Sequence, residues 1–503
     1  MTIEKSGIYQ TQEKNLRETV VRHIVKFSLA SLIGGIGGFL NSYFAALLLG
    51  PTVWGIWRGA ILVLQYGANF HLGVQDGMHR ELPILRGKKE IEQQTIITDV
   101  TFTFSFIVAI VASLGILSST FVITMGPELK LSLQFISAMV FLQYISGFYG
   151  SLFRATNEFD IVSKVTVIGG LASLFSIILI FFFGLLGFLG GQLIRLLIIT
   201  CYSYWKSSYS INWHWDNKVL KSLIVIGFPI MLMIFAHIIF TTIDRLLILK
   251  FLDAESLGFY SLGTLIFAPL FIIFSTSNSV MYPRFAEKYG ETGSPYSLRR
   301  YITVPMENLA ALISILIGAI YIALPALVRV FLPEYNEGIP AARILIFGLF
   351  FYAVRGMAGN MLLTINKQVL YLGIMFGAAL LNLIFSYSAL KLGYGIVGIA
   401  VGTSLAYFVY FLISTILAMR FSQASLIEII KLFVKVLGPI CYVGIVVIIF
   451  SMLMPVGAGK LSSMITQTIF RELVFFILTL YFIYKISQGK IVNLFVRRNN
   501  IKL

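Results

Sequence analysis

The sequence predicts an all-α polytopic membrane protein with about 14 transmembrane helices. Its 503 residues are 58% hydrophobic and 12% charged, with a mean hydropathy of +0.89, whereas soluble domains carry about 25% charged residues. Apolar runs of roughly 20 residues, the length that crosses a bilayer as an α-helix, recur along the chain. The connections between the runs are short, so we expect no soluble domain on either side.

The predicted spans follow one another along the whole chain. Residues 1–26 are polar, and the first apolar run is too long for the apolar core of a signal peptide, so we expect no cleaved signal. The spans lie at 24–49, 52–75, 97–124, 132–153, 162–184, 187–205, 222–249, 257–281, 302–330, 340–364, 369–390, 394–419, 433–454 and 469–487.

The distribution of basic residues predicts that both termini are cytoplasmic. Lys and Arg concentrate in the cytoplasmic loops of membrane proteins. With a cytoplasmic N-terminus and an even number of spans, most of the 38 Lys and Arg residues fall on the cytoplasmic side. This asymmetry also accounts for the net charge of +16, so we expect no nucleic-acid partner. The residues that fall on the outer side are Lys130, Lys250, Arg329, Arg343, Lys391, Lys460 and Arg471.

A faint internal repeat predicts two lobes in the same orientation. Residues 49–57 resemble residues 252–260, and the same offset pairs Asn41 with Asp244. We therefore expect an N-lobe of six helices, an interlobe linker, a C-lobe of six helices, and two further helices with a cytoplasmic tail. Their expected bounds are 1–205, 206–221, 222–431 and 432–503, respectively.

A polar stripe marks the predicted second span. Arg58, Gln65, Asn69 and Asp76 are spaced by 7, 4 and 7 residues, which at about 100° per residue places them on one face of a helix. A charge that faces lipid costs several kcal/mol, so the stripe predicts a face turned toward the protein interior or a water-filled cavity.

Three local patterns resemble one family of transporters. They are Leu-Gly-x-x-x-x-Gly-Ile-Trp at 49–57, Leu-Gly-Val-Gln-Asp-Gly-Met-His-Arg at 72–80, and Phe228-Pro229 followed by Asp244-Arg245. Together with the two six-helix lobes plus two helices, the chain resembles the polysaccharide-biosynthesis (O-antigen flippase, Wzx-type) branch of the multidrug/oligosaccharidyl-lipid/polysaccharide (MOP) exporter superfamily. The resemblance covers essentially the whole chain.

The resemblance implies a flippase in the bacterial cytoplasmic membrane. Its cargo would be an undecaprenyl-diphosphate-linked oligosaccharide repeat unit, moved to the outer leaflet by alternating access for surface polysaccharide biosynthesis. The implied partners are the lipid-linked oligosaccharide, membrane lipids, and the polymerase and chain-length proteins of the same pathway. Related peptidoglycan-lipid flippases have an arginine-lined central cavity, and Arg58 fits that pattern by its place in the second span.

Four arginines remain after the residues of loops and outer helix ends are assigned: Arg58, Arg195, Arg245 and Arg355. A guanidinium group suits a diphosphate because its fork of donors matches the phosphate oxygens and it stays charged. We expect these arginines, with Gln65 and Asn69, to bind the substrate. The alternative for Arg58 and Arg245 is that they extend to the outer interface, and for Arg195 and Arg355 that a structural partner neutralises them.

Few titratable groups are available for coupling or gating. His237 and Asp244 share one face of the span 222–249, and either is a candidate to carry a coupling proton or to bind a sodium ion. The alternatives are that Asp244 neutralises Arg245 or Arg58 and that His237 only packs. Asp76 is a candidate gate residue that pairs with Arg80 or His79, or else a solvated helix end. We expect no resident cofactor, only H⁺ or Na⁺ as a coupling ion.

Two other function classes remain as alternatives. A drug or cation antiporter of the same superfamily would have a mostly acidic and aromatic cavity, whereas the charges inside these spans are mainly arginine and favour an anionic cargo. A membrane-embedded polysaccharide polymerase or ligase would need a sizeable outer loop, and the outer loops here are short. The sequence contains no phosphate-binding glycine loop, no metal-ligand cluster and no nucleophile with a base partner, so we do not expect an enzyme.

Overall fold

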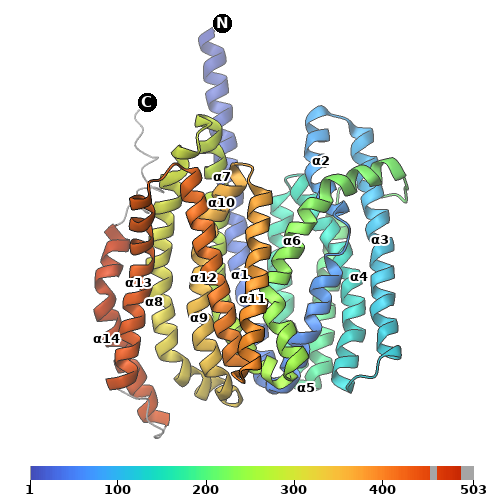
Figure 1. The fold of residues 1–503 in the computed structure, drawn as a ribbon. Helices are drawn as coiled ribbons and strands as arrows, with labels where there is room; N and C mark the ends of the chain where they lie inside the picture. The colour runs from blue at the N-terminus through green and yellow to red at the C-terminus, as the bar shows by residue number, and fades with distance from the viewer. Residues whose placement is uncertain (1, 454–460, 489–503) are drawn as a thin grey trace. The chain divides into compact units, whose positions relative to one another are not determined.

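The computed structural model of this protein describes residues 2–453 and 461–488, and it is built from α-helices with no strand in those residues (Figure 1). This confirms the predicted all-α fold class. Two short 3₁₀ helices, η1 (Pro295–Leu298) and η2 (Pro333–Gly338), precede α8 and α9. The α-helices are α1 (Thr2–Ala68), α2 (Val74–Lys88), α3 (Ile91–Val122), α4 (Pro127–Ala155), α5 (Phe159–Lys206), α6 (Asn217–Phe251), α7 (Ala254–Thr292), α8 (Arg299–Phe331), α9 (Ile339–Val354), α10 (Gly356–Thr364), α11 (Gln368–Lys391), α12 (Gly395–Phe421), α13 (Leu426–Leu453) and α14 (Leu461–Gln488).

Twelve stretches of the described residues are long and apolar enough to cross a membrane, so the chain is a multi-pass membrane protein. The sequence predicts about 14 spans, and the difference lies in α1 and α5. Their apolar parts are 43 and 48 residues long, about twice what one crossing needs. Each therefore contains two of the predicted spans, joined without an intervening loop.

A glycine breaks each of these two long helices. Gly50 (φ 71°, ψ 171°) and Gly184 (φ 54°, ψ −130°) have backbone angles that are not helical and that a residue with a Cβ adopts only under strain. In Figure 1 the blue chain of α1 reverses direction at the lower end of the drawing. In α5 the two arms touch, because a Cβ on Gly187 would lie 1.9 Å from the carbonyl oxygen of Leu179. Both helices are thus hairpins of two antiparallel arms.

The chain folds into two compact units, Met1–Ile238 (the N-terminal unit) and Ile239–Leu503 (the C-terminal unit), and α6 contributes residues to both. In the N-terminal unit, α1 packs closely on α5. A Cβ on Gly37 would lie 2.4 Å from the carbonyl oxygen of Gly170, and one on Gly34 would lie 2.9 Å from that of Thr166. Small residues allow such close approach of backbones, which favours helix association in membranes.

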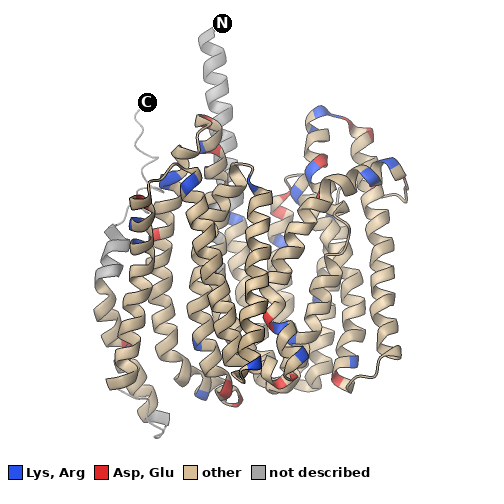
Figure 2. Ribbon diagram, viewed as in Figure 1, with Lys and Arg blue, Asp and Glu red and all other residues tan. Residues whose placement is uncertain are grey.

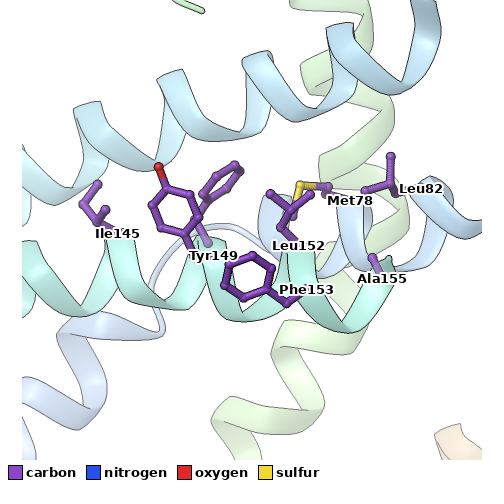
Figure 3. Packing of buried hydrophobic residues seen from close by; sticks show 8 residues of the cluster. Met78, Leu82, Ile145, Tyr149, Leu152, Phe153 and Ala155 are labelled. Carbon is purple, nitrogen blue, oxygen red and sulfur yellow. The ribbon is translucent and has the colours of Figure 1, made fainter. Parts of the chain in front are cut away.

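Helix α2 lies outside the membrane spans and covers the end of α4. Its buried residues Met78 and Leu82 pack against an apolar cluster of α4 that includes Phe148, Leu152 and Phe153 (Figure 3). The basic residues of its last turn, Arg86 and Lys88, are exposed. The apolar side of α2 therefore docks this helix on α4, and the basic residues of its last turn face outward.

The segment 207–216 between α5 and α6 is not helical and attaches to α3. The backbone N–H of Asn212 donates to Asp99 Oδ1 at 3.0 Å, and that of His214 donates to Thr103 Oγ1 at 3.2 Å. Trp213 packs edge-on against Phe106, with 4.9 Å between ring centroids. Buried polar side chains of α3 thus satisfy backbone groups that have no helical partner.

In the C-terminal unit, α7, α9 and α12 surround a shared apolar core, which includes Leu257, Tyr260, Leu345 and Ile399. Helix α14 packs on α8, where Phe475 contacts the bare backbone of Gly318. The predicted span 340–364 is divided into α9 and α10 at Arg355. Within each unit, Figure 2 shows charged residues mainly at the ends of helices and few along their middle. The predicted cytoplasmic tail beyond residue 488 lies outside the described residues.

Candidate functional site

The N-terminal unit contains a cavity of about 500 Å³ between the arms of α1 and α5. Arg58 and Arg195, two of the predicted substrate-binding residues, both line it. Its other polar lining residues are Asn41, Ser42, Thr166, Ser173 and Gln192. The glycines at positions 34, 38, 169 and 170 line the cavity too, and their missing side chains contribute to its volume.

A chain of hydrogen bonds orients Arg195. The amide of Asn41 donates to the carbonyl of Ser173 at 2.5 Å and also to the hydroxyl of Ser176. Asn41 Oδ1 therefore faces Gln192, whose Nε2 donates to it at 2.9 Å. This leaves Gln192 Oε1 to accept from Arg195 Nε at 3.2 Å. Each amide has one donor side and one acceptor side, so the orientation of Asn41 fixes that of the arginine.

The ring of Trp54 lies beside Arg58 in the lining of the same cavity. The guanidinium carbon of Arg58 lies 5.8 Å from the ring centroid of Trp54, within cation–π range. Trp54 and the neighbouring Trp57 are both buried. Phe188 meets both rings edge-on, at 6.2 and 4.9 Å. The hairpin of α5 thus supplies the ring that fixes the indole groups of α1.

The charge of this cavity is positive. None of its lining residues is acidic, while two are arginine. Charges at membrane depth require a partner or an anionic ligand, and the fork of a guanidinium group matches phosphate or carboxylate oxygens. The two guanidinium groups in the lining are chemically suited to the oxygens of an anion. The sequence analysis did not select Asn41 and Gln192. Gln192 precedes Arg195 by three residues, the spacing of neighbours on a helix face, and Asn41 is the repeat partner of Asp244, so both signals were present in the sequence.

The other residues of the predicted stripe do not line this cavity. Gln65 lies in the last turn of α1, and Asn69 Nδ2 donates to the Gln65 backbone carbonyl at 2.8 Å, which caps the helix end. The stripe was predicted to continue to Asp76 on the same helix, and this is wrong. Leu72 (φ 49°) and Gly73 (φ 79°) turn the chain in left-handed conformations, so Asp76 lies in α2.

Asp76 faces His71 instead of Arg80 or His79. Its Oδ2 lies 4.0 Å from His71 Nε2. Burial raises the pKa of the Asp76 carboxyl to about 6, and the charge of Arg154 partly opposes that rise. Burial lowers the pKa of the His71 imidazole to about 4. Burial therefore shifts both pKa values so that the neutral forms of Asp76 and His71 are favoured.

In the C-terminal unit, Arg355 lies at the junction of α9 and α10, and only 7% of it is exposed. Its guanidinium carbon lies 4.5 Å from the ring centroid of Tyr352 and 4.2 Å from that of Tyr410. Its Nη1 donates to the hydroxyl of Tyr371. Among the described residues no carboxylate forms an ion pair with Arg355, so aromatic faces are what surround this charge.

Asp244 is buried in α6, with 4% of its surface exposed. The hydroxyl of Tyr260 donates to its Oδ2 at 2.6 Å and lies 3.3 Å from Thr403 Oγ1. Thr403 and Ser386 both donate to Asn382 Oδ1, at 3.2 and 2.9 Å. No ion pair of Asp244 with an arginine is found in the part of the chain that the structure describes. The half-buried Arg245 follows it, and the half-buried His237 lies two turns earlier in α6.

Comparison with known proteins agrees with this architecture. Residues 72–340, more than half of the chain, match the family described as "Polysaccharide biosynthesis protein". The fold resembles that of the lipid II flippase MurJ in its inward closed conformation, with a TM-score of 0.69, 14% identity, and coverage of 92% of this chain and 99% of that one. A search of curated proteins found no match.

Two further solved structures have the same fold. An inward-facing multidrug resistance MATE transporter of the MOP superfamily matches with a TM-score of 0.64 and 16% identity, over 80% of this chain and 99% of that one. A MOP superfamily transporter from Pyrococcus furiosus, described as having a binding pocket of reverse polarity, matches with a TM-score of 0.57 and 16% identity, over 80% and 95% of the two chains.

Proposed function

Because the chain belongs to the polysaccharide biosynthesis protein family and has the fold of MOP superfamily transporters, we propose that it flips a lipid-linked oligosaccharide. The cargo would be a sugar repeat unit on undecaprenyl diphosphate, moved across the bacterial cytoplasmic membrane by alternating access. The observation that carries this proposal is the cavity around Arg58 and Arg195, which is lined by two arginines and no acid.

The two arginines would bind the diphosphate of the cargo. A diphosphate presents many acceptor oxygens and at least two negative charges. The amide chain through Asn41 and Gln192 holds Arg195 in place before the cargo arrives. A preorganised donor loses little conformational freedom on binding, so more of the interaction energy appears as affinity. Each charged hydrogen bond would contribute about 1.5–3 kcal/mol, or roughly tenfold or more in binding.

Coupling to an ion gradient would involve Asp244. Its carboxylate and the oxygens of Tyr260, Thr403 and Asn382 form one connected group inside the C-terminal unit. Oxygen ligands suit a hard cation such as Na⁺, and a buried acid can also carry a proton. The cargo chemistry itself needs no catalytic group, and we propose a transporter without enzymatic activity.

Complementation of surface polysaccharide in a strain that lacks this protein tests the proposal. Arg58→Ala and Arg195→Ala should each abolish export while the protein stays at normal levels in the membrane. Lysine at either position keeps the charge but loses the fork, so it should export at an intermediate level. Arg86→Ala, which removes an exposed arginine of α2, is the matched control. Full export by both alanine variants would refute the arginine cavity as the cargo site.

A cation or drug antiporter is the second candidate, favoured by the fold shared with MATE transporters. The acid-free lining of the N-terminal cavity opposes it, because a cationic drug would meet two arginines. Purified protein in proteoliposomes separates the two. Accumulation of ethidium driven by an H⁺ or Na⁺ gradient, without movement of a fluorescent polyprenyl-diphosphate sugar, would establish the antiporter.

A further inference from the structure

We propose that the C-terminal unit holds a second cavity that binds a sugar ring. This cavity has a volume of about 280 Å³ and lies between α7, α9, α10 and α11. Small-ligand pockets start at about 300 Å³, so it offers space for one ring and not for a whole repeat unit. The inference rests on the proposed function, because that function makes a sugar the cargo. The properties of the cavity are independent of it.

Two buried polar atoms of the lining lack a hydrogen-bond partner among the described residues. One is a donor, Arg355 Nε, and the other is an acceptor, Asn278 Oδ1. Leaving a buried polar group unsatisfied costs about 1–3 kcal/mol, and such groups in native proteins call for a ligand, ion or water. Because one atom donates and the other accepts, an anion satisfies only half of this pair. A hydroxyl group both donates and accepts, so it suits both.

The walls of the cavity suit the apolar face of a sugar. Phe274, Tyr352 and Tyr371 line it from three different helices. The face of an aromatic ring is negative and attracts the weakly positive C–H groups of a sugar ring. Asn360 adds a second amide, and its Nδ2 donates to the backbone carbonyl of Asn278 at 3.0 Å. The N-terminal cavity also has aromatic and amide groups in its lining, but two arginines line it, whereas this cavity is lined by one, Arg355.

Two glycines of α10 make room for these side chains. A Cβ on Gly356 would lie 2.1 Å from the amide nitrogen of Asn278, and one on Gly359 would lie 2.7 Å from the hydroxyl of Tyr371. Tyr371 also accepts from Arg355 Nη1, which fixes the guanidinium with its Nε edge unused. These contacts hold the polar atoms of the cavity in place before a ligand enters.

Saturation-transfer difference NMR on the purified full chain tests the proposal, in a detergent without a sugar headgroup. The probes are N-acetylglucosamine, galactose, rhamnose and glucuronate at millimolar concentration, with pyrophosphate as competitor. At least one sugar should show ring-proton signals that pyrophosphate leaves unchanged. Asn278→Leu should reduce them roughly tenfold, as expected for a lost buried hydrogen bond and its unpaired partner.

A second variant and two controls keep the result interpretable. Leu363→Trp narrows the cavity without changing its polar atoms, and it should also reduce the signals. Asn336→Ala, at an exposed asparagine of the same unit, and Arg86→Ala, at an exposed arginine of α2, should not. Absence of signals for all four sugars, or unchanged signals in both cavity variants at an unchanged unfolding temperature, would overturn the proposal. Sugar binding without transport of a lipid-linked sugar would instead refute only the proposed function.

Discussion

Gln192 donates a hydrogen bond to Asn41 Oδ1 at 2.9 Å, although the two residues are 151 positions apart in the chain. The bond joins the second arm of α5 to the first arm of α1 and leaves Gln192 Oε1 facing Arg195. The charge of Arg195 is therefore held by a neutral acceptor. This matters for binding, because a neutral partner orients the guanidinium without competing with an anionic cargo.

We predict that Gln192→Glu abolishes export. The new carboxylate would lie where Oε1 accepts from Arg195 Nε, so it would neutralise the arginine and compete with the diphosphate. The protein should remain folded, because the shape of the side chain is kept. The measurement is polysaccharide export together with the unfolding temperature, and Gln368→Glu at an exposed position is the control. Normal export by Gln192→Glu would show that Arg195 does not contact the cargo.

Asp244→Asn should uncouple transport from the ion gradient. The amide keeps an acceptor for Tyr260 but carries no charge and cannot exchange a proton. Transport in proteoliposomes should therefore proceed equally with and without an imposed Na⁺ or H⁺ gradient. Asn382→Asp, which adds a charge to the same group, should retain the dependence. If Asp244→Asn remains gradient-dependent and only Asp244→Ala loses folded protein, the residue is structural.

The stability of the N-terminal unit should depend on pH through Asp76 and His71. The pKa of Asp76 is raised to about 6 by burial, so its contribution to stability is present below its unfolded value near pH 4 and is lost as pH rises through 6. The pKa of His71 is lowered to about 4 by burial, so its contribution rises with pH between 4 and 6.5. The two slopes oppose each other.

Asp76→Asn removes one of these slopes. The unfolding temperature of this variant should rise more steeply from pH 4 to 6.5 than that of the wild type, and at pH 7 it should exceed the wild-type value. Thermal unfolding in detergent across this pH range gives the measurement, and Glu92→Gln, at an exposed acid of α3, is the control. If the unfolding temperatures of Asp76→Asn and the wild type change in parallel with pH, the raised pKa of Asp76 is contradicted.

Gly184→Ala should destabilise the hairpin of α5 by about 1–3 kcal/mol, because its backbone lies in a region that only glycine adopts without strain. A Cβ there would meet nothing within 4 Å, so conformational strain is the whole effect. Gly190→Ala is a matched control in the same helix with equally open space, and it should be neutral or slightly stabilising. Equal unfolding temperatures for the two variants would argue against the strained turn.

Cysteine labelling tests the predicted orientation. After Cys201 and Cys441 are replaced, a cysteine at Asn336 in η2 should react with a membrane-impermeant reagent added outside intact cells. A cysteine at Gly290 in α7 should react only after the membrane is opened. The reverse pattern would overturn the assignment of both termini to the cytoplasm, which the Lys and Arg distribution predicts.

The sequence by itself determined the all-α membrane architecture, because continuous runs of about 20 apolar residues have the length that crosses a bilayer as an α-helix, in which all backbone groups are satisfied within the run. It also singled out Arg58, Arg195, Arg355 and Asp244, since charged residues are rare in such spans and stand out in the sequence. The pattern of apolar residues did not reveal that α1 ends at Ala68. Asp76 therefore lies on another helix, α2. The helical spacing of the polar residues continues in the sequence across Leu72 and Gly73, although their left-handed conformations break the helix there.

Only the tertiary structure decided which of these residues share a cavity. Asn41 and Gln192 are ordinary amides in the sequence, and they gain a role because α1 and α5 pack closely through glycine contacts. The unpaired atoms of Asn278 and Arg355 likewise come together only when α7 packs on the α9–α10 junction. A hydrogen bond between distant residues depends on the register of two helices to within about an ångström, and side-chain packing sets that register.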